Sequence, residues 1–178
     1  MSVMMRLIAI AAAMSAFLIV MVGDHQFRRT SGTEVILDLE PVDPRDLLAG
    51  YYVIISTPVH RIQFESVGGD TTFAVHDDVF VVVEENTNGS WTPTSIHRER
   101  PADGVFLHGK VQSAGDDSMS ADFNIERYYA DETTAQALEN RRREDRESLR
   151  LIVAVGADGR ALIRGLEIDG EREIAPLL

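Results

Sequence analysis

The sequence predicts a mainly β protein: an antiparallel sandwich or barrel-like domain with one short capped helix and one surface helix, preceded by a single N-terminal transmembrane helix. Three observations support this class: an uncharged apolar N-terminal run, short apolar–polar alternations separated by turn residues, and one charged helix-forming segment. Regular short strands between turns are typical of sandwiches and barrels. We expect an anchor over residues 1–23, a connector over 24–32 and a β-rich extracytoplasmic domain over 33–178.

The apolar run covers residues 7–23 and contains no charged side chain. As a helix it would be about 26 Å long, slightly less than the roughly 30 Å hydrocarbon core of a bilayer. Arg6 can extend its side chain to the membrane surface, which lengthens the span. A cleaved signal peptide is the alternative, but the end of the run offers only Gly23 and has Met21 where cleavage requires a second small residue. We therefore favour an uncleaved anchor that contacts membrane lipid.

Positive charges flank the anchor on both sides, with Arg6 before it and Arg28 and Arg29 after it. The positive-inside rule consequently leaves the orientation of the chain open. Long domains translocate largely regardless of such charges, so an external C-terminal domain is compatible with this pattern.

The first strand is expected in TEVILDLEPV, residues 33–42, where apolar and polar residues alternate. The following DPRDLLAG has the signals of a short helix: Asp43 suits the N-cap, and Asp46 faces the unpaired amide groups of the first turn. The proline after Asp43 suits the first helical position. Gly50 suits the position after the helix, where φ is positive. This helix would reverse the chain before the strand YYVIIST, residues 51–57.

Further strand-like runs are separated by turn signals such as GGD, NTNG, PADG and AGDD. The last of them flank GADG, residues 156–159, which is a hairpin signal with apolar alternation on both sides. The remaining expected strands cover residues 59–66, 71–75, 78–85, 91–97 and 104–112.

One segment, residues 131–150, has helix-forming composition, with acids at its start and arginines later. Glu139 and Arg143 form a favourable i,i+4 pair. Because its apolar positions are few, we expect a surface helix whose N-terminal half contacts the domain.

The chain carries a formal net charge of −12 at pH 7 and contains no cysteine. Removing the anchor, whose one charged residue is Arg6, leaves an even more acidic domain. An acidic domain repels phosphate backbones, which argues against nucleic acid as a partner. The lack of cysteine excludes disulfides, thiolate catalysis and cysteine-ligated zinc within this sequence.

No spacing in the sequence supports a metal site or a catalytic constellation. The five histidines show none of the pairings typical of helical metal sites. The HDD stretch at residues 76–78 lies at an expected strand start, where polar residues are ordinary. The single lysine, Lys110, lies in a strand of ordinary alternation, which is weak support for a serine–lysine hydrolase. We expect no metal, no cofactor and no catalytic residue.

The tyrosines form two pairs, Tyr51–Tyr52 and Tyr128–Tyr129. Aromatic residues in adjacent strands usually pack on one face of a sheet. The sharper alternative is an exposed aromatic patch that binds a partner.

Several stretches, namely GTEVILDLEPVDPRDLLAGYYVIISTP, FNIERYYADE and DGRALIRGLEIDG, together with the anchor, resemble the GDYXXXLXP family of membrane-anchored bacterial proteins. Gly50, Tyr52 and Pro58 stand at the G, Y and P of the naming motif. Tyr51 replaces its acid and Ser56 its leucine. The IERYYADE element retains Glu126, Tyr128 and Glu132.

The resemblance implies a small single-pass protein of the bacterial cytoplasmic membrane, with its C-terminal domain on the periplasmic side and no established catalysis. It also implies a possible multi-pass membrane protein as partner. We therefore expect a membrane-anchored accessory or binding domain; the alternative is an envelope hydrolase that uses a carboxylate cluster near Asp43, Asp46 and Glu126. The candidate binding residues are Asp43, Arg45, Asp46, Gly50, Tyr52, Glu126, Arg127 and Tyr129.

Overall fold

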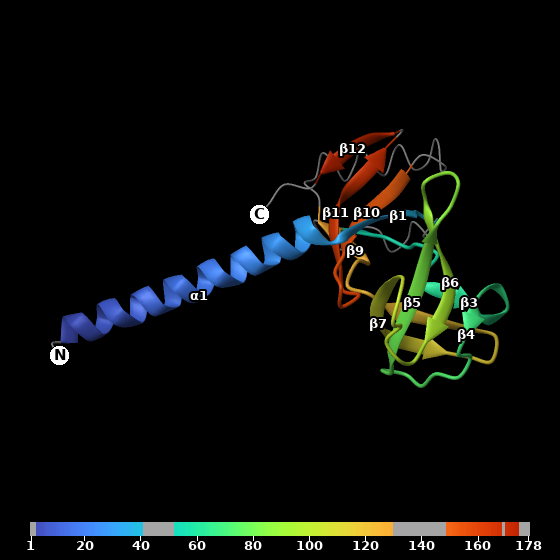
Figure 1. Cartoon of the computed structure of the whole chain (residues 1–178), viewed down its shortest axis with the longest axis horizontal. Helices are drawn as coiled ribbons and strands as arrows, with labels where there is room; N and C mark the ends of the chain where they lie inside the picture. The colour runs from blue at the N-terminus through green and yellow to red at the C-terminus, as the bar shows by residue number, and fades with distance from the viewer. Residues whose placement is uncertain (1–2, 41–51, 130–148, 169, 175–178) are drawn as a thin grey trace.

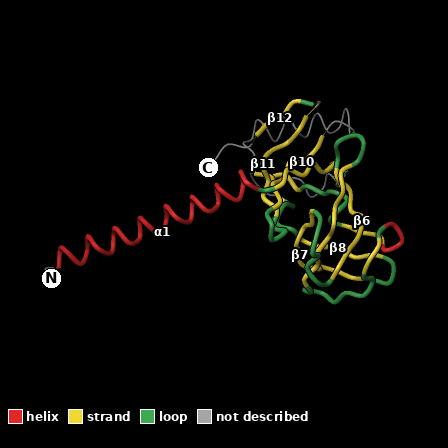
Figure 2. The backbone as a smooth tube through the Cα atoms, in the orientation of Figure 1, coloured by secondary structure: helices red, strands yellow, loops and turns green. Residues whose placement is uncertain are grey.

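The computed structural model shows a long N-terminal helix that projects from a domain built of strands (Figure 1). It describes residues 3–40, 52–129, 149–168 and 170–174. Strands dominate the domain, with loops and one short 3-10 turn between them (Figure 2). The predicted mainly β class with one N-terminal apolar helix is confirmed.

Helix α1 (Val3–Ser31) is 29 residues long. Its segment Val3–Asp24 has a mean hydropathy of 2.3, and none of it is buried in the molecule. By length and composition this segment can cross a membrane. The helix continues past Gly23 to Ser31, so most of the expected connector is helical.

The smaller sheet is antiparallel and has the order β1-β10-β11-β12. Its register places Thr33 opposite Val155 and Asp38 opposite Arg150, so β10 runs back toward the end of α1. The four strands are β1 (Thr33–Asp38), β10 (Leu149–Val155), β11 (Ala161–Ile168) and β12 (Glu171–Ile174).

The larger sheet has six strands in the order β3-β8-β7-β5-β6-β4 and is antiparallel except for the pairing of β4 with β6. A separate two-stranded sheet pairs β2 (Tyr52–Ile54) with β9 (Arg127–Tyr129). The strands of the larger sheet are β3 (Arg61–Gln63), β4 (Gly68–Gly69), β5 (Asp78–Glu85), β6 (Trp91–His97), β7 (Val105–Ala114) and β8 (Ser118–Asp122).

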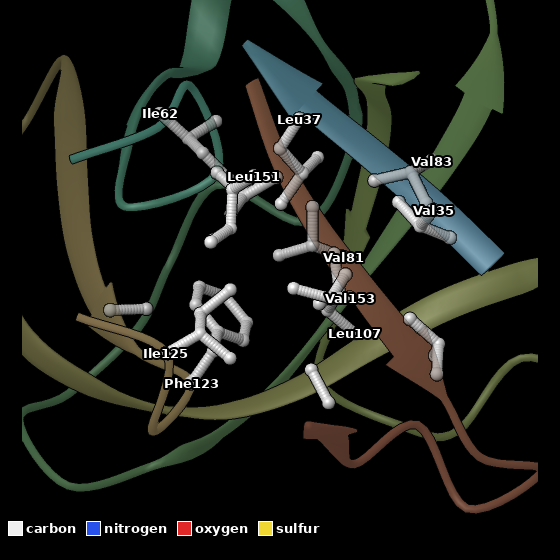
Figure 3. Close-up of a cluster of buried hydrophobic side chains, with 14 of the residues drawn as sticks. Val35, Leu37, Ile62, Val81, Val83, Leu107, Phe123, Ile125, Leu151 and Val153 are labelled. Atoms are coloured by element: carbon white, nitrogen blue, oxygen red, sulfur yellow. The ribbon is translucent and has the colours of Figure 1, made fainter. Parts of the chain in front are cut away.

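The hydrophobic core lies between the four-stranded and the six-stranded sheet, where alternate residues of their strands point inward (Figure 3). In β5 this alternation buries every second residue, which is the pattern of a strand with one face on a core. Burying one such aliphatic side chain stabilises the fold by about 1.5–3 kcal/mol. The residues labelled in Figure 3 are Val35, Leu37, Ile62, Val81, Val83, Leu107, Phe123, Ile125, Leu151 and Val153.

Several predicted elements differ from the structure. Residues 71–75 form a loop in place of a strand; its Phe73 stacks on Phe64 at 6.5 Å, and Asp77 accepts a hydrogen bond from the Ala74 amide. Leu149 and Arg150, expected at the end of the surface helix, begin β10. The short helix over 43–50 and the rest of the segment 131–150 lie outside the described residues.

Candidate functional site

The two-stranded sheet of β2 and β9 brings together two sequence elements that are far apart in the chain. Tyr52 pairs with Tyr129, and Ile54 pairs with Arg127. Just beyond this register, the Ile55 amide donates a hydrogen bond to the Glu126 carbonyl oxygen at 2.8 Å. The YYVIISTP and IERYY stretches therefore form one structural unit.

A tight turn follows β2 and leads into β3. The His60 amide donates to the Thr57 carbonyl oxygen at 2.9 Å, which closes a turn over residues 57–60. Pro58 occupies the second position of this turn, where its fixed φ is favourable. Thr57 is fully buried and His60 is 9% exposed, so this turn places polar groups inside the molecule.

His60 connects this turn to the segment before β9. Its Nδ1 accepts a hydrogen bond from the Thr57 amide at 2.9 Å and lies 3.0 Å from the Thr57 hydroxyl. Since Nδ1 is an acceptor, the ring hydrogen is on Nε2, which lies 3.0 Å from Glu126 Oε1. The same oxygen accepts the Phe123 amide at 2.6 Å. We call Thr57, His60 and Glu126 the Thr57–His60–Glu126 array.

Two carboxyl groups at this array have their pKa values shifted in opposite directions. Burial alone would raise the pKa of Glu126, but hydrogen bonds from His60, Asp122 and the Phe123 amide outweigh it and lower the pKa to about 2. Burial, followed by the hydrogen bond with Glu126, raises the pKa of Asp122. The pair thus favours a charged Glu126 beside an Asp122 that holds its proton more tightly.

A hydroxyl, an imidazole and a carboxylate in this order are also the parts of a hydrolytic triad. Here the Thr57 side chain is fully buried, and the backbone amide of Thr57 already occupies the lone pair of His60 Nδ1. A nucleophile must be reachable by substrate and must be able to pass its proton to the imidazole. The array meets neither condition, and its geometry instead holds the 57–60 turn against the segment that leads into β9.

A profile of the GDYXXLXY protein family matches residues 14–166. The match includes part of α1, the whole six-stranded sheet, β1, β10, most of β11 and the whole array. The chain belongs to the GDYXXLXY protein family. The family named in the sequence analysis was GDYXXXLXP. The motif of the matching family has two residues in place of three between the tyrosine and the leucine, and it ends in tyrosine in place of proline. Comparisons with curated proteins and with solved structures found no significant match.

The GDYXXLXY pattern, placed with its glycine at Gly50 and its first tyrosine at Tyr52, ends at the array. Ile55 then stands at the leucine and is 6% exposed, and Thr57 stands at the final tyrosine. Ser56, assigned to the leucine in the sequence comparison, is instead a spacer under this spelling. The described part of the motif consists of β2 and the start of the buried turn.

The candidate binding residues fall into two groups. Glu126 belongs to the array, Arg127 is exposed, and Tyr52 and Tyr129 are backbone partners in the two-stranded sheet. The other four, Asp43, Arg45, Asp46 and Gly50, lie outside the described residues.

The chain on either side of residues 41–51 can nevertheless be placed. Before them, the Leu39 amide donates to the Leu149 carbonyl oxygen at 3.2 Å, and Glu40 bridges to Ser56. After them, Tyr52 pairs with Tyr129. The described residues on the two sides of segment 41–51 therefore contact β10 before the segment and β9 after it.

The sequence did not predict the role of His60 in connecting the 57–60 turn to Glu126. The spacing between histidines indicates metal sites, and it does not reveal His60 because its partner is a carboxylate 66 residues away. A Thr-x-x-His stretch after a strand, with a proline between, is the local signal of the turn. No local signal identifies Glu126 as its partner.

Asp78, the last residue of the HDD stretch, forms a separate surface cluster with His108 and Lys110 on the larger sheet. Asp78 Oδ1 lies 2.9 Å from both His108 Nε2 and Lys110 Nζ. Its hydrogen bonds with Lys110 and then His108 lower the pKa of Asp78. Among the residues that the structure describes, no group of three or more histidines and acids is arranged to hold a metal ion.

Proposed function

We propose that this GDYXXLXY family protein is a membrane-anchored accessory or binding domain that works with a membrane-protein partner on the periplasmic side of the bacterial cytoplasmic membrane. The observation that carries the proposal is the direct continuation of α1 into β1. Only Gly32 separates Ser31 from Thr33, and α1 also contacts β10 and β11. A domain attached in this way has a fixed orientation relative to its helix.

The junction leaves little space for movement at Gly32. A Cβ atom at this position would lie 3.0 Å from the backbone N and O atoms of Val155. Flexible linkers are rich in glycine and serine over many residues, which is the opposite of this arrangement. A fixed orientation is useful for a domain that must meet a partner in the same membrane.

The two-stranded sheet supports a binding surface on this domain. Arg127 is exposed next to the paired positions Tyr52 and Tyr129, and arginine and tyrosine are enriched in binding hot spots. The proposed surface also includes the stretch of chain that precedes β2, with the candidate residues Asp43, Arg45, Asp46 and Gly50. A multi-pass membrane protein is the partner that the anchor favours.

A hydrolase that uses Asp43, Asp46 and Glu126 receives less support. Glu126 Oε1 is engaged by His60 and by the Phe123 amide, and the pKa of Glu126 is lowered to about 2. A general acid or base works best with a pKa near the operating pH. Glu126 therefore fits a structural role better than a proton-transfer role.

Co-purification from membranes in mild detergent tests the partner. The full chain is compared with a variant that has a flexible Gly-Ser-Gly-Ser insertion between Ser31 and Gly32. We expect the wild-type chain to retain a membrane protein that the variant loses, while both show the same thermal melt. The control carries the same insertion after Thr87, in the exposed β5–β6 turn. Equal retention by all three chains would contradict the role of the fixed orientation.

The orientation in the membrane is tested with a single cysteine, because the natural chain has none. Thr87→Cys places it in the exposed Asn86–Gly89 turn. We expect a membrane-impermeant maleimide to label intact spheroplasts as strongly as lysed ones. Labelling that requires lysis would place the domain in the cytoplasm and would show that Arg28 and Arg29 decide the orientation.

A further inference from the structure

The β10–β11 turn lies at the end of the domain where α1 leaves it. Thr33, the first residue of β1, pairs with Val155, the last residue of β10. The turn Gly156–Arg160 follows immediately, closed by hydrogen bonds from the Gly156 amide to the Arg160 carbonyl and from the Gly159 amide to the Gly156 carbonyl, both 2.9 Å. Because β1 runs away from α1, this antiparallel turn lies on the side of the domain nearest the helix (Figure 1).

The turn is held firmly against β7 and the loop before it. The His108 amide donates to the Gly159 carbonyl oxygen at 2.8 Å. Arg100 Nη2 donates to the Ala157 carbonyl oxygen at 2.7 Å, and its guanidinium lies 5.6 Å from the centre of the Phe106 ring. The turn is therefore a fixed feature of this surface.

Two exposed arginines, Arg100 and Arg160, lie at this turn together with the turn's one acid, Asp158, in a chain whose formal net charge is −12. The Arg160 side chain is 74% exposed, and its Nε lies 3.9 Å from Asp158 Oδ2. An exposed arginine close to a bilayer surface attracts the phosphates of lipid headgroups.

The length of the helix brings this surface to the membrane. The span ends at Asp24, and seven more helical residues reach Ser31, a rise of about 10 Å. The headgroup layer on each side of a bilayer is roughly 5–8 Å thick. An ordinary helix tilt of about 20° closes the remaining gap on one side of the helix.

We propose that the Gly156–Arg160 turn rests on the lipid headgroups of the membrane that α1 spans, with Arg160 binding headgroup phosphate. This proposal rests on the proposed membrane anchoring and adds a second, electrostatic contact between the domain and the bilayer. The surface at this turn carries Arg100 and Arg160 against the turn's one acid, Asp158, whereas the chain as a whole is acidic.

The test uses the full chain reconstituted in vesicles of phosphatidylglycerol or of phosphatidylcholine. A nitroxide is attached to Ala157→Cys, which is exposed in the β10–β11 turn, or to Thr87→Cys, which is exposed in the β5–β6 turn. We expect collisions with an aqueous nickel chelate to be at least about twofold rarer at position 157 than at position 87 in phosphatidylglycerol, since headgroups exclude the chelate. Phosphatidylcholine, or Arg160→Glu in the Ala157→Cys chain, should reduce this difference.

Vesicle flotation separates failure of this inference from failure of the anchor. Chains that float with the vesicles but show equal accessibility at positions 157 and 87 overturn the headgroup contact alone. Chains that do not float overturn the anchor and the contact with it. A difference that persists unchanged in Arg160→Glu overturns the role of Arg160, and the purified system contains no partner protein that could shield the turn.

Discussion

The imidazole of His60 accepts a hydrogen bond from the Thr57 amide and directs its own hydrogen to Glu126. One backbone donor therefore selects the ring tautomer, and the tautomer in turn selects a carboxylate as the partner. The result is a polar array, buried at Thr57 and His60 and partly exposed at Glu126, in which each group has a hydrogen-bond partner. Such arrays are costly when one member is removed, because the others stay buried without compensation.

The lowered pKa of Glu126 predicts how stability depends on pH. Its folded pKa of about 2 lies below the ordinary value of 4.5, so its stabilisation is present above pH 4.5 and is lost as the pH falls toward about 2. We expect Glu126→Gln to destabilise the full chain in detergent by about 1–3 kcal/mol at pH 7. The difference in melting temperature from wild type should shrink between pH 4.5 and 2.5. A constant difference would exclude a charged Glu126 as the cause.

Asp122 provides a control of opposite sign. Its pKa is raised from the ordinary value of 3.8, so its stabilisation is present below that value and is lost as the pH rises through the folded pKa. Asn imitates the protonated form. We therefore expect Asp122→Asn to melt at or above the wild-type temperature at pH 7, and a large decrease would contradict the assignment of the proton to Asp122.

At the scale of single elements, the strands that the sequence predicted over their full range are rich in β-branched and aromatic residues. Residues 78–85 and 91–97 form strands over the predicted ranges, and β-branched and aromatic residues dominate the first of them. β8 was missed because SMSAD is made of residues with weak strand preference, and only its pairing with β7 and β3 defines it. The array was missed for the same reason: its contacts are not local.

The β10–β11 turn gives a test of packing at an element boundary. Gly159 and Gly89 have nearly the same φ, 79° and 80°, so an alanine at either carries a similar backbone cost of about 1–2 kcal/mol. A Cβ at Gly159 would also lie 2.6 Å from Phe106, whereas nothing lies within 4 Å at Gly89. We expect Gly159→Ala to be the more destabilising by about 1–3 kcal/mol in thermal melts. Equal melts would mean that Phe106 moves aside without cost.

At the scale of the whole molecule, a helix of 29 residues and a β domain share one continuous backbone. The helix over the apolar run was predictable, because uncharged apolar runs of this length are typical of membrane-crossing helices and of signal sequences. The helical continuation to Ser31 was not, since a polar segment after a span is compatible with helix or linker. Its structure follows from contacts of α1 with β10 and β11 that the sequence does not display.

An α-helix turns by about 100° per residue. The short junction at Gly32 therefore makes the rotational orientation of the domain about the helix axis depend on the number of residues in α1. In the proposed single-pass arrangement, one alanine inserted after Asp24 would rotate the whole domain about the membrane normal by that angle, while raising it by only about 1.5 Å. Seven alanines would bring the domain back to within about 20° of its original rotational orientation. Retention of the proposed membrane-protein partner should therefore fall with one or two inserted residues and recover with seven. A steady decline with the number of inserted residues would show that the distance of the domain from the membrane, and not its rotational orientation, governs the association.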